Sequence, residues 1–356
     1  MKYTTKQFFL FFLVVLIQSC NSIEKAKVAF TDESFQSRYK IDNGKSLDIN
    51  DTTLVNPSNI VYHPKGYLLF LDSQSDYFVK IININTGTVQ KIVKKGRGPN
   101  ECIYISNISI VNNDVWLHDP GLRKMINLKL DSIGIFHVSN ELQMGVQAGR
   151  FVALTDDLFV GTTYSENRVT YFNRKGKLLY KAGGFPRDIS NKMSKGILPN
   201  IVFQTMITAS PDGKNVVLAN LSVDVLEVYS NKGDTVCILG GPDGFETTVK
   251  PHDVGGGRTF PLDPVFFAYR DIKGLTNEMW ASYAGIEIVK GEMPISNKVL
   301  PNKIYCFSWQ GVPIRKIELD IRFLSFAIDS KNMKLYCLVN VPKIRVIVYD
   351  MSKTNI

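Results

Sequence analysis

The sequence is poor in the residues that build metal centres and catalytic triads. Its 356 residues include four histidines and five cysteines. The cysteines form no CxxC pair, and no HxH, HExxH or DxDxDG spacing occurs, so the patterns of zinc, thioredoxin-like and EF-hand calcium sites are missing. The GxSxG motif of α/β-hydrolases is missing as well. We therefore expect no metal site and no cofactor.

Charge of one sign is nowhere concentrated. Lys and Arg number 42 and Asp and Glu 33, a net charge of +9, but no block of five or six like charges exists. A basic balance spread so thinly does not favour a nucleic acid partner. No stretch keeps a 3.6-residue apolar period either, so we expect almost no helix. The 44% of apolar residues is typical of a globular chain.

One long apolar run is present, at residues 8–17 (FFLFFLVVLI), behind Lys2 and Lys6. Ten residues are too few to span about 30 Å of hydrocarbon, but they fit the apolar centre of a signal peptide, which we place at residues 1–19. No other apolar run approaches eighteen residues, so no membrane-spanning helix is expected elsewhere.

The end of this run resembles a bacterial lipobox. Ile17 stands three residues before Cys20 and the small Ser19 just before it; in such signals cleavage precedes the cysteine, whose thiol is then acylated. We expect palmitate or a similar lipid on Cys20 to anchor the chain in the cell envelope, at the outer membrane. Gln18 departs from the commonest lipobox, and an ordinary secretory signal with an incidental cysteine is the alternative.

Residues 20–37 are polar with only isolated apolar positions, so we expect a flexible tether between the lipid and the folded domain. Lipoproteins exported to the cell surface often carry an acidic run after the lipidated cysteine, whereas Glu24 is followed by Lys25 here. This favours an orientation toward the periplasm.

A repeat organises the remaining chain. Six segments each combine a turn signal with a short alternating apolar run, and a second strand-like run follows each of them. Alternation with period 2 and β-branched and aromatic residues indicate strands. Five of the second runs end in a glycine that suits a tight hairpin turn. The segments are residues 65–72, 113–119, 156–161, 212–219, 277–283 and 332–338, and the glycines are Gly87, Gly134, Gly176, Gly233 and Gly311.

The glycine spacings are 47, 42, 57 and 78 residues, and a four-stranded propeller blade takes about 40–50 residues. The longer intervals hold polar inserts near 184–200, 240–263 and 285–301. Six copies predict an all-β fold, a six-bladed β-propeller of four-stranded antiparallel blades over residues 38–356. The last blade lacks a fourth strand, so residues 39–49 are expected to complete it and close the ring. Two β domains in tandem are the alternative.

A resemblance to a known family supports this architecture. Residues 96–101 (GRGPNE) closely resemble the GRGPxE signature after the first blade of TolB-like six-bladed propeller lipoproteins of anaerobic Gram-negative bacteria. Residues 280–285 and 300–311 are similar to that family's penultimate blade and 320–349 to its last, although NHL-type propellers share the blade pattern. The resemblance covers about 50–356 and the lipoprotein start. It implies a fold and an envelope location, but no established reaction.

Chemistry-bearing residues are scattered along this repeat. The four histidines lie mostly in or beside expected strands and are interpreted as structural, and the cysteines after Cys20 as buried free thiols, with disulfides as the alternative. Some six-bladed propellers are metal-dependent lactonases with carboxylates in the channel, but the inner strands here offer amides, one arginine and one early acid, a poor set for a hard cation. These residues are His63, His118, His137 and His252; Cys102, Cys237, Cys306 and Cys337; and Asn59, Asn107, Gln204, Arg270 and Asp271.

The loops between blades are the best candidates for a binding surface. Three Gly-rich loops at equivalent positions of the repeat each carry an arginine, and guanidinium forks with backbone N–H groups suit an anionic or polar ligand. The alternative is that Arg97 pairs with Glu101 and merely shapes its loop. The candidate residues are Arg97, Glu101, Arg187, His252, Arg258, Tyr269 and Tyr283.

The resulting functional hypothesis is a monomeric, membrane-anchored envelope lipoprotein. Its propeller is a binding platform for a protein, peptide or glycan and catalyses no reaction. The alternative is a propeller enzyme, a hydrolase or lyase acting on a carbohydrate or lactone at the channel mouth.

The lipobox yields a direct prediction. Cys20→Ala removes the acylated thiol, so the variant is expected to carry no lipid and to be soluble if it is processed. Metabolic labelling with palmitate measures this, with Cys102→Ala as the control that keeps its label. Label retained by Cys20→Ala contradicts the lipobox.

Overall fold

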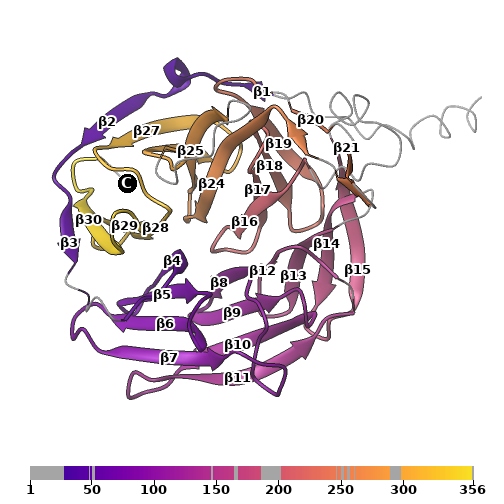
Figure 1. Ribbon diagram of the computed structural model, residues 1–356, viewed down its shortest axis with the longest axis vertical. Coiled ribbons are helices and arrows are strands. Elements are labelled where there is room, and N and C mark those ends of the chain that lie inside the picture. Colours follow the sequence, from indigo (N-terminus) through magenta and orange to yellow (C-terminus); the bar gives the residue numbers. More distant parts are fainter. Residues whose placement is uncertain are drawn as a thin grey trace, which may run out of the picture.

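Six four-stranded antiparallel sheets stand in a ring around a central channel in the computed structural model (Figure 1). The structure describes residues 28–47, 49, 53–145, 147–163, 167–185, 202–245, 247–249, 252–254, 257–259, 261–288 and 298–354. Within these residues the only helix is a 3-10 turn, η1 (Asp32–Ser34). The all-β six-bladed propeller is therefore confirmed.

The first three blades follow the repeat directly. Strands that are consecutive in sequence are neighbours in the sheet, so each blade is built from local hairpins. Blade one contains β4 (Pro57–His63), β5 (Tyr67–Asp72), β6 (Tyr77–Asn83) and β7 (Val89–Lys94); blade two β8 (Asn107–Val111), β9 (Asp114–Asp119), β10 (Lys124–Leu130) and β11 (Phe136–Gln143); blade three β12 (Phe151–Ala153), β13 (Leu158–Thr162), β14 (Asn167–Asn173) and β15 (Leu178–Gly184).

The other three blades each take one strand from the N-terminal segment: blades four and five have four antiparallel strands of their own and gain a fifth, and blade six has three and gains its fourth. The added strands are β1 (Val28–Ala29), β2 (Ser37–Ile41) and β3 (Lys45–Leu47), which join blades four, five and six in that order. Blade four contains β16 (Thr205–Ala209), β17 (Asn215–Asn220), β18 (Val225–Ser230) and β19 (Thr235–Gly240); blade five β24 (Val265–Gly274), β25 (Glu278–Ile288), β26 (Lys303–Ser308) and β27 (Pro313–Leu319); blade six β28 (Ser325–Asp329), β29 (Lys334–Val339) and β30 (Arg345–Asp350).

The five predicted turn glycines connect the third and fourth strands of blades one to five. All have a positive φ, a backbone conformation that residues with a side chain rarely adopt. At Gly176 a Cβ atom would stand 2.2 Å from the Gln143 carbonyl oxygen. Both the positive φ and this close approach therefore require glycine at this position. The φ angles are 70° at Gly87, 86° at Gly134, 69° at Gly176, 91° at Gly233 and 85° at Gly311.

The ring closes where the sequence predicts. β3 pairs antiparallel with β30, with Lys45 opposite Val348 and Leu47 opposite Val346. This pairing supplies the missing fourth strand of blade six, so residues 45–47 and 346–348 share one sheet. Within the predicted segment 39–49, residues 45–47 are thus confirmed as the closing strand, whereas residues 39–41 belong to β2 and pair with β27 of blade five.

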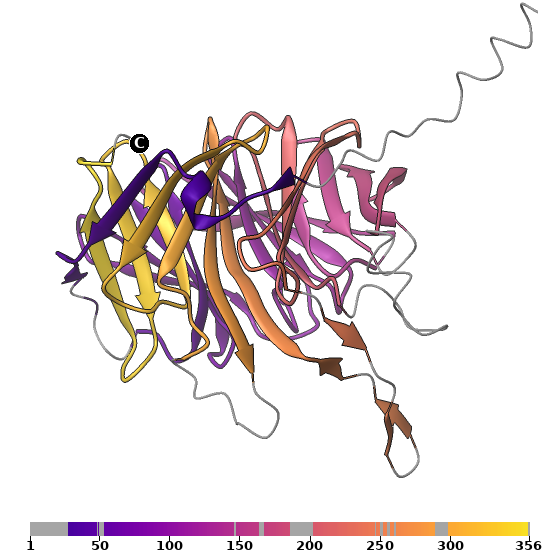
Figure 2. The ribbon, with the colours of Figure 1, turned by 90° about the horizontal axis from the view of Figure 1, so that it is seen from above.

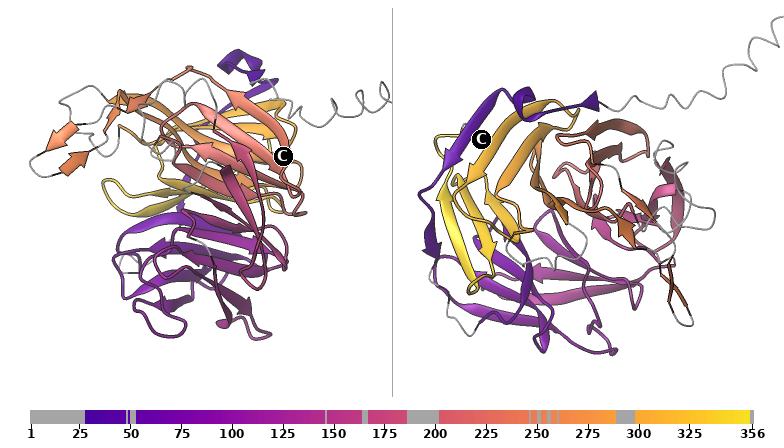
Figure 3. Two further views of the ribbon diagram at one scale, coloured as in Figure 1. Left: turned by 90° about the vertical axis from the view of Figure 1, so that its right-hand side faces the viewer. Right: turned by 45° about the horizontal axis from the view of Figure 1, so that its top comes forward.

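The tether prediction for residues 20–37 is wrong from residue 28 onward. β1 runs parallel to β19 and β2 parallel to β27, so the segment forms a strap around the outside of blades four and five (Figures 1 and 3). Phe30 and Phe35 are buried because their rings fill the space between these blades. Such isolated apolar positions give no periodic signal in a sequence. Residues 20–27 lie outside the described residues.

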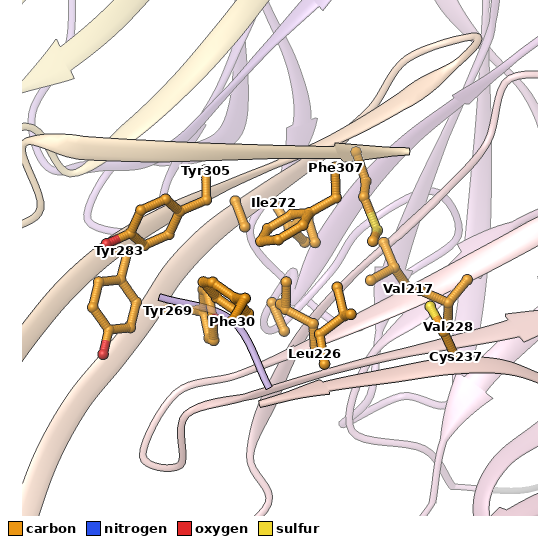
Figure 4. Packing of buried hydrophobic residues seen from close by; sticks show 14 of the residues in the cluster. Phe30, Val217, Leu226, Val228, Cys237, Tyr269, Ile272, Tyr283, Tyr305 and Phe307 are labelled. Carbon is orange, nitrogen blue, oxygen red and sulfur yellow. The ribbon is translucent and has the colours of Figure 1, made fainter. Parts of the chain in front are cut away.

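The strap residues complete the core between blades four and five. The Phe35 ring stacks on Tyr305 with centroids 5.0 Å apart, and Phe30 meets Phe307 edge to face at 5.0 Å. Figure 4 shows Phe30 lying against the aromatic rings of blade five and beside Leu226 of blade four. Asp32 adds a polar contact, since it accepts a hydrogen bond from the Tyr305 hydroxyl at 2.6 Å.

The insert near 240–263 forms small hairpins of its own. β20 (Thr248–Val249) pairs with β23 (Leu262–Asp263), and β21 (His252–Val254) with β22 (Gly257–Thr259). Figure 2 shows these strands extending beyond one face of the ring. The inserts near 184–200 and 285–301 fall largely outside the described residues. Across the described ranges, no helix has the length and apolar character needed to cross a bilayer.

The strap yields a stability prediction. Phe35→Ala leaves a cavity against Tyr305, so the free energy of unfolding is expected to fall by about 3–5 kcal/mol. Denaturant titration of the chain from residue 21 measures this loss. Val28→Ala, at a position 53% exposed on the same segment, is the control and should change stability by no more than about 0.5 kcal/mol. A Phe35→Ala variant as stable as Val28→Ala would mean that the strap does not pack in solution.

Candidate functional site

The inner strands of all six blades line a cavity of about 460 Å³ along the central axis. One end lies at the turns between the first and second strands of the blades, where Pro64, Pro211 and Ser330 contribute to its wall. The cavity is within the usual size range of small-molecule sites. The closed ring forms the wall of this cavity, which makes the cavity a candidate ligand site.

A second cavity, of about 270 Å³, lies toward the other end of the inner strands. We call this end, where the loops between blades open, the loop face. Asn59 and Met206 line both cavities, so the two spaces adjoin. We call the smaller cavity the mouth cavity. Its polar lining comes from Ser58, Asn59, Ser73, Tyr104, Ser106 and Arg150.

Several polar groups of the inner strands tie neighbouring blades together. The Asp271 carboxylate accepts hydrogen bonds from the Ser325 hydroxyl and the Phe326 N–H of blade six. The Ser325 hydroxyl in turn accepts one from the Ile60 N–H of blade one at 3.1 Å. Asp271 also forms an ion pair with Lys273 at 3.0 Å. The one early acid of the inner strands is thus engaged in holding the ring.

Asn107 has the same role between blades two and three. Its amide donates to the Phe151 carbonyl at 2.7 Å, and the Ala153 N–H donates to the Ser109 hydroxyl at 3.2 Å. Buried polar groups need such partners. Among the described residues, no three His, Cys, Asp or Glu side chains come together as metal ligands would.

Arg270 lies next to Asp271 but is not engaged in this way. Its guanidinium stands over the Phe267 ring at 5.1 Å, and its buried Nε has no hydrogen-bond partner. No described residue forms an ion pair with it. Burial lowers the pKa of Arg270, and the charge of Arg150 lowers it further.

Arg150 is held in place by the loop before blade two. It donates from Nη1 to the Ser106 carbonyl, and the Ser106 hydroxyl bonds to His118 Nδ1 at 2.7 Å. Burial, with a further contribution from Arg150, lowers the pKa of His118 to about 3. The imidazole is consequently neutral at physiological pH and acts as a structural support for the mouth cavity.

Buried carboxylates anchor the loops of this face. Asp72 accepts from the Val55 and Asn56 N–H groups, both at 2.9 Å. Asp119 accepts from the Ile103 N–H at 2.7 Å, and so fixes the loop that brings Tyr104 and Ser106 to the mouth cavity. Hydrogen bonds to backbone N–H groups suit a carboxylate well.

A third loop is held by Asp224. It accepts from the Asp243 and Gly244 N–H groups at 2.8 and 2.9 Å. Burial nevertheless raises the pKa of Asp224 to about 7, and its Oδ1 lacks a partner. These aspartates stand at or beyond strand ends, where the sequence gives no signal that distinguishes them from exposed turn residues.

The predicted pair Arg97 and Glu101 lies in the loop between β7 and β8. The Gly98 N–H donates to Glu101 Oε2 at 2.9 Å, so Glu101 does shape the loop, but through backbone. Arg97 is exposed, forms no ion pair with any described residue, and lines neither of the two cavities. The loop reaches the channel through Tyr104 and Ser106 instead, which the sequence analysis did not single out.

The other predicted arginines cannot be assigned to a common site. Arg187 and Cys20 lie outside the described residues. His252 and Arg258 belong to the β21–β22 hairpin, whose backbone extends away from the ring (Figure 2). That these residues bind one ligand stays a prediction.

Tyr269 and Tyr283 are core residues, which corrects their proposed place on an exposed binding surface. Their rings are 0% and 1% exposed and lie against each other and Tyr305 (Figure 4). The Tyr269 hydroxyl donates to the Gly241 carbonyl at 3.1 Å and that of Tyr283 to Asp243 at 2.7 Å. The alternating strand pattern predicts burial for one face of β24 and β25, and these aromatic residues belong to it.

The interpretation of the cysteines is confirmed for the described residues. Cys102, Cys237, Cys306 and Cys337 are buried free thiols. His63 is likewise structural, since its Nε2 lies 2.9 Å from the Asn113 carbonyl and its Nδ1 accepts from the Lys65 N–H.

The ring of blades and its channel define a six-bladed β-propeller. The family model described as TolB-like 6-blade propeller-like matches residues 35–331, so the chain belongs to this family. No curated protein matches it.

The chain is similar to several solved structures of low sequence identity. They include the Cps50 (Swd1) β-propeller domain of Myceliophteria thermophila, with 11% identity, a TM-score of 0.48, and 86% of this chain and 99% of that one covered. Kuenenia stuttgartiensis hydrazine synthase has 12% identity and a TM-score of 0.48, with 86% and 79% covered. Virginiamycin B lyase from Staphylococcus aureus has 13% identity and a TM-score of 0.47, with 86% and 98% covered.

The buried His118 yields a pH prediction. Its pKa in the folded protein, about 3, lies below the ordinary value of about 6.5, so the unfolded chain binds the extra proton first. The stability that the neutral imidazole contributes is complete above pH 6.5 and is lost as the pH falls toward 3. When the pH falls from 7.5 to 5, the free energy of unfolding of the unchanged protein should decrease by about 2 kcal/mol more than that of the His118→Gln variant.

Denaturant titrations at both pH values measure this difference. His137→Gln, at an exposed position of β11, is the control and should keep the pH dependence of the unchanged protein. If His118→Gln shows the same loss as the unchanged protein, His118 is not the neutral buried group that the fold implies.

Proposed function

We propose that this chain is a lipid-anchored protein of the cell envelope whose propeller binds a partner protein, peptide or glycan at the loop face. The lipobox at Cys20 supports the anchoring, and the family supports the propeller as a binding platform. Binding without catalysis is the activity that the arrangement of the channel favours.

The observation that carries this proposal is the open mouth cavity and its unengaged polar groups. Ser58 and Asn59 contribute side chains with no hydrogen-bond partner among the described residues. Tyr104 is 49% exposed at the same cavity, although large aromatic side chains are usually covered. Free polar groups around a concave space with an exposed aromatic ring are typical of a recognition site.

The titratable groups near the channel support binding more than catalysis. Asp271 already accepts hydrogen bonds from blade six and pairs with Lys273. His118 is neutral, buried and bonded to Ser106. A general acid or base must reach a proton of the substrate, whereas both of these groups are occupied by the scaffold.

The strap supports the proposed geometry of anchoring. Its first described strand, β1, lies on the outer edge of blade four, and residues 20–27 can span at most about 29 Å between the lipid and this edge.

Exposed residues at opposite ends of the blades provide the test. The full chain in detergent is incubated with solubilised envelope material, and retained molecules are identified by mass spectrometry. Tyr104→Ala is expected to lower retention of the specific ligand by about tenfold or more, because it removes an aromatic contact at the mouth cavity. Ile133→Ala, 78% exposed in the turn between β10 and β11 at the other end of blade two, should retain it fully.

Melting curves of both variants should match that of the unchanged protein. Equal retention by Tyr104→Ala and Ile133→Ala would contradict binding at the loop face. A ligand that is converted during the incubation would contradict the absence of catalysis.

A further inference from the structure

The turn between β14 and β15 in blade three carries a local excess of positive charge. Residues 174–181 contain four cations and no acid. All four side chains are exposed, and none of them forms an ion pair with another described residue. The equivalent turn of blade four is balanced, since Asp234 follows Lys232 there. The four cations are Arg174, Lys175, Lys177 and Lys181.

Two leucines beside these cations are exposed as well. Leu178 is 38% and Leu179 46% exposed. The register of β15 shifts at this point, because Phe172 lies opposite Leu178 and Tyr171 opposite Tyr180. A bulge of this kind interrupts the regular alternation of side chains and lets two consecutive apolar residues be exposed together. Exposed apolar side chains that lie together are typical of a surface that meets a partner.

The outer edge of β15 is open in the described structure. The sheet of blade three ends at β15, whereas β1 and β2 lie outside β19 and β27 in blades four and five. Figure 1 shows β15 on the circumference of the ring. The basic and apolar side chains of residues 174–181 therefore belong to the outer rim of blade three, which the strap does not cover.

The N-terminal segment joins the ring at the neighbouring blade. β1 pairs with β19 of blade four, and the Tyr180 hydroxyl of β15 donates to the Asn231 carbonyl in the turn before β19. Residues 20–27 span at most about 29 Å. A lipid on Cys20 would therefore hold the rim of blade three within reach of the bilayer that contains the lipid.

We propose that this rim, residues 174–181, docks on a bilayer surface with anionic lipid headgroups. The proposal goes beyond the proposed function and takes from it only the location of the chain at a membrane. The four cations are attracted to the anionic headgroups, and Leu178 and Leu179 enter the boundary between headgroups and acyl chains. An acidic polypeptide would match the cations alone, whereas a bilayer matches both the cations and the leucines.

Sedimentation with lipid vesicles tests this proposal on the chain from residue 21. This chain contains every described residue but lacks Cys20 and the apolar run at residues 8–17, which would attach it to any bilayer. It should bind vesicles of phosphatidylcholine and phosphatidylglycerol in equal parts about tenfold more tightly than vesicles of phosphatidylcholine alone. Added salt should weaken this binding, because salt screens exposed charges.

Two double variants examine the two kinds of contact. Lys175→Gln with Lys177→Gln should weaken binding to the anionic vesicles by about tenfold or more, since each cation near an anionic surface contributes about fivefold. Leu178→Ser with Leu179→Ser should weaken it by about fivefold or more, because it removes the apolar contact.

Matched controls come from equivalent turns of other blades. Lys232→Gln replaces an exposed lysine of the blade-four turn. Val312→Ala replaces a residue that is 50% exposed in the turn between β26 and β27. Both controls should bind the anionic vesicles like the unchanged chain. All variants should melt with the unchanged chain, because every substituted side chain is exposed.

Equal binding to neutral and anionic vesicles, or unchanged binding of either double variant, would overturn the membrane assignment. If the chain ignores vesicles but binds soluble polyglutamate through Lys175 and Lys177, the rim recognises an acidic polypeptide and the assignment is equally wrong. None of these results contradicts the proposed function, since the chain from residue 21 carries no lipid. Palmitate labelling of Cys20 and capture through Tyr104 test that function separately.

Discussion

The antiparallel pairing of β3 with β30 is the interaction on which the rest of the structure depends. It joins residues 45–47 to residues 346–348 and thereby turns a row of blades into a closed ring. The channel exists only because of this closure, since its wall takes inner strands from every blade. The N-terminal strap also pairs with open sheet edges. It adds β2 and β1 as parallel strands to the outer edges of blades five and four, which would otherwise offer unpaired backbone groups.

Two arginines of the blades differ in how completely their side chains are hydrogen-bonded. Arg168, between blades three and four, donates to Glu227 at 2.7 and 2.9 Å and to Asn220 at 3.1 Å. The Tyr229 hydroxyl satisfies Glu227 further. Such a fully bonded pair is stable in a low dielectric and serves the fold. Arg270 has no carboxylate partner in the described structure, and its Nε has no hydrogen-bond partner, so it does not join two blades in this way.

The blades could be predicted from the sequence because their determinants are local. Period-2 alternation and the turn glycines specify each hairpin within about 20 residues, and the unmatched strand at residues 39–49 revealed the closure. The strap could not be predicted in the same way. β1 and β2 pair with strands more than 200 residues away, and single residues such as Phe35 have no period to detect. The prediction for Tyr269 is wrong because residue type alone does not distinguish an aromatic residue on a buried strand face from one at a binding surface.

The candidate site could be predicted only in outline, because the ring assembles it from residues that are far apart in sequence. The expectation that loops between blades reach the channel holds for the loop after β7, yet Tyr104 and Ser106 are the residues that arrive there, not Arg97. Ser58 of blade one, Ser106 before blade two and Met206 of blade four come together at the mouth cavity only after the ring assembles. Hydrogen bonds between the inner strands, such as those of Asp271 and Asn107, then hold neighbouring blades in fixed positions. The mouth cavity keeps Ser58 and Asn59 without hydrogen-bond partners among the described residues, and departures of this kind from local pairing rules are expected where a fold recognises a ligand.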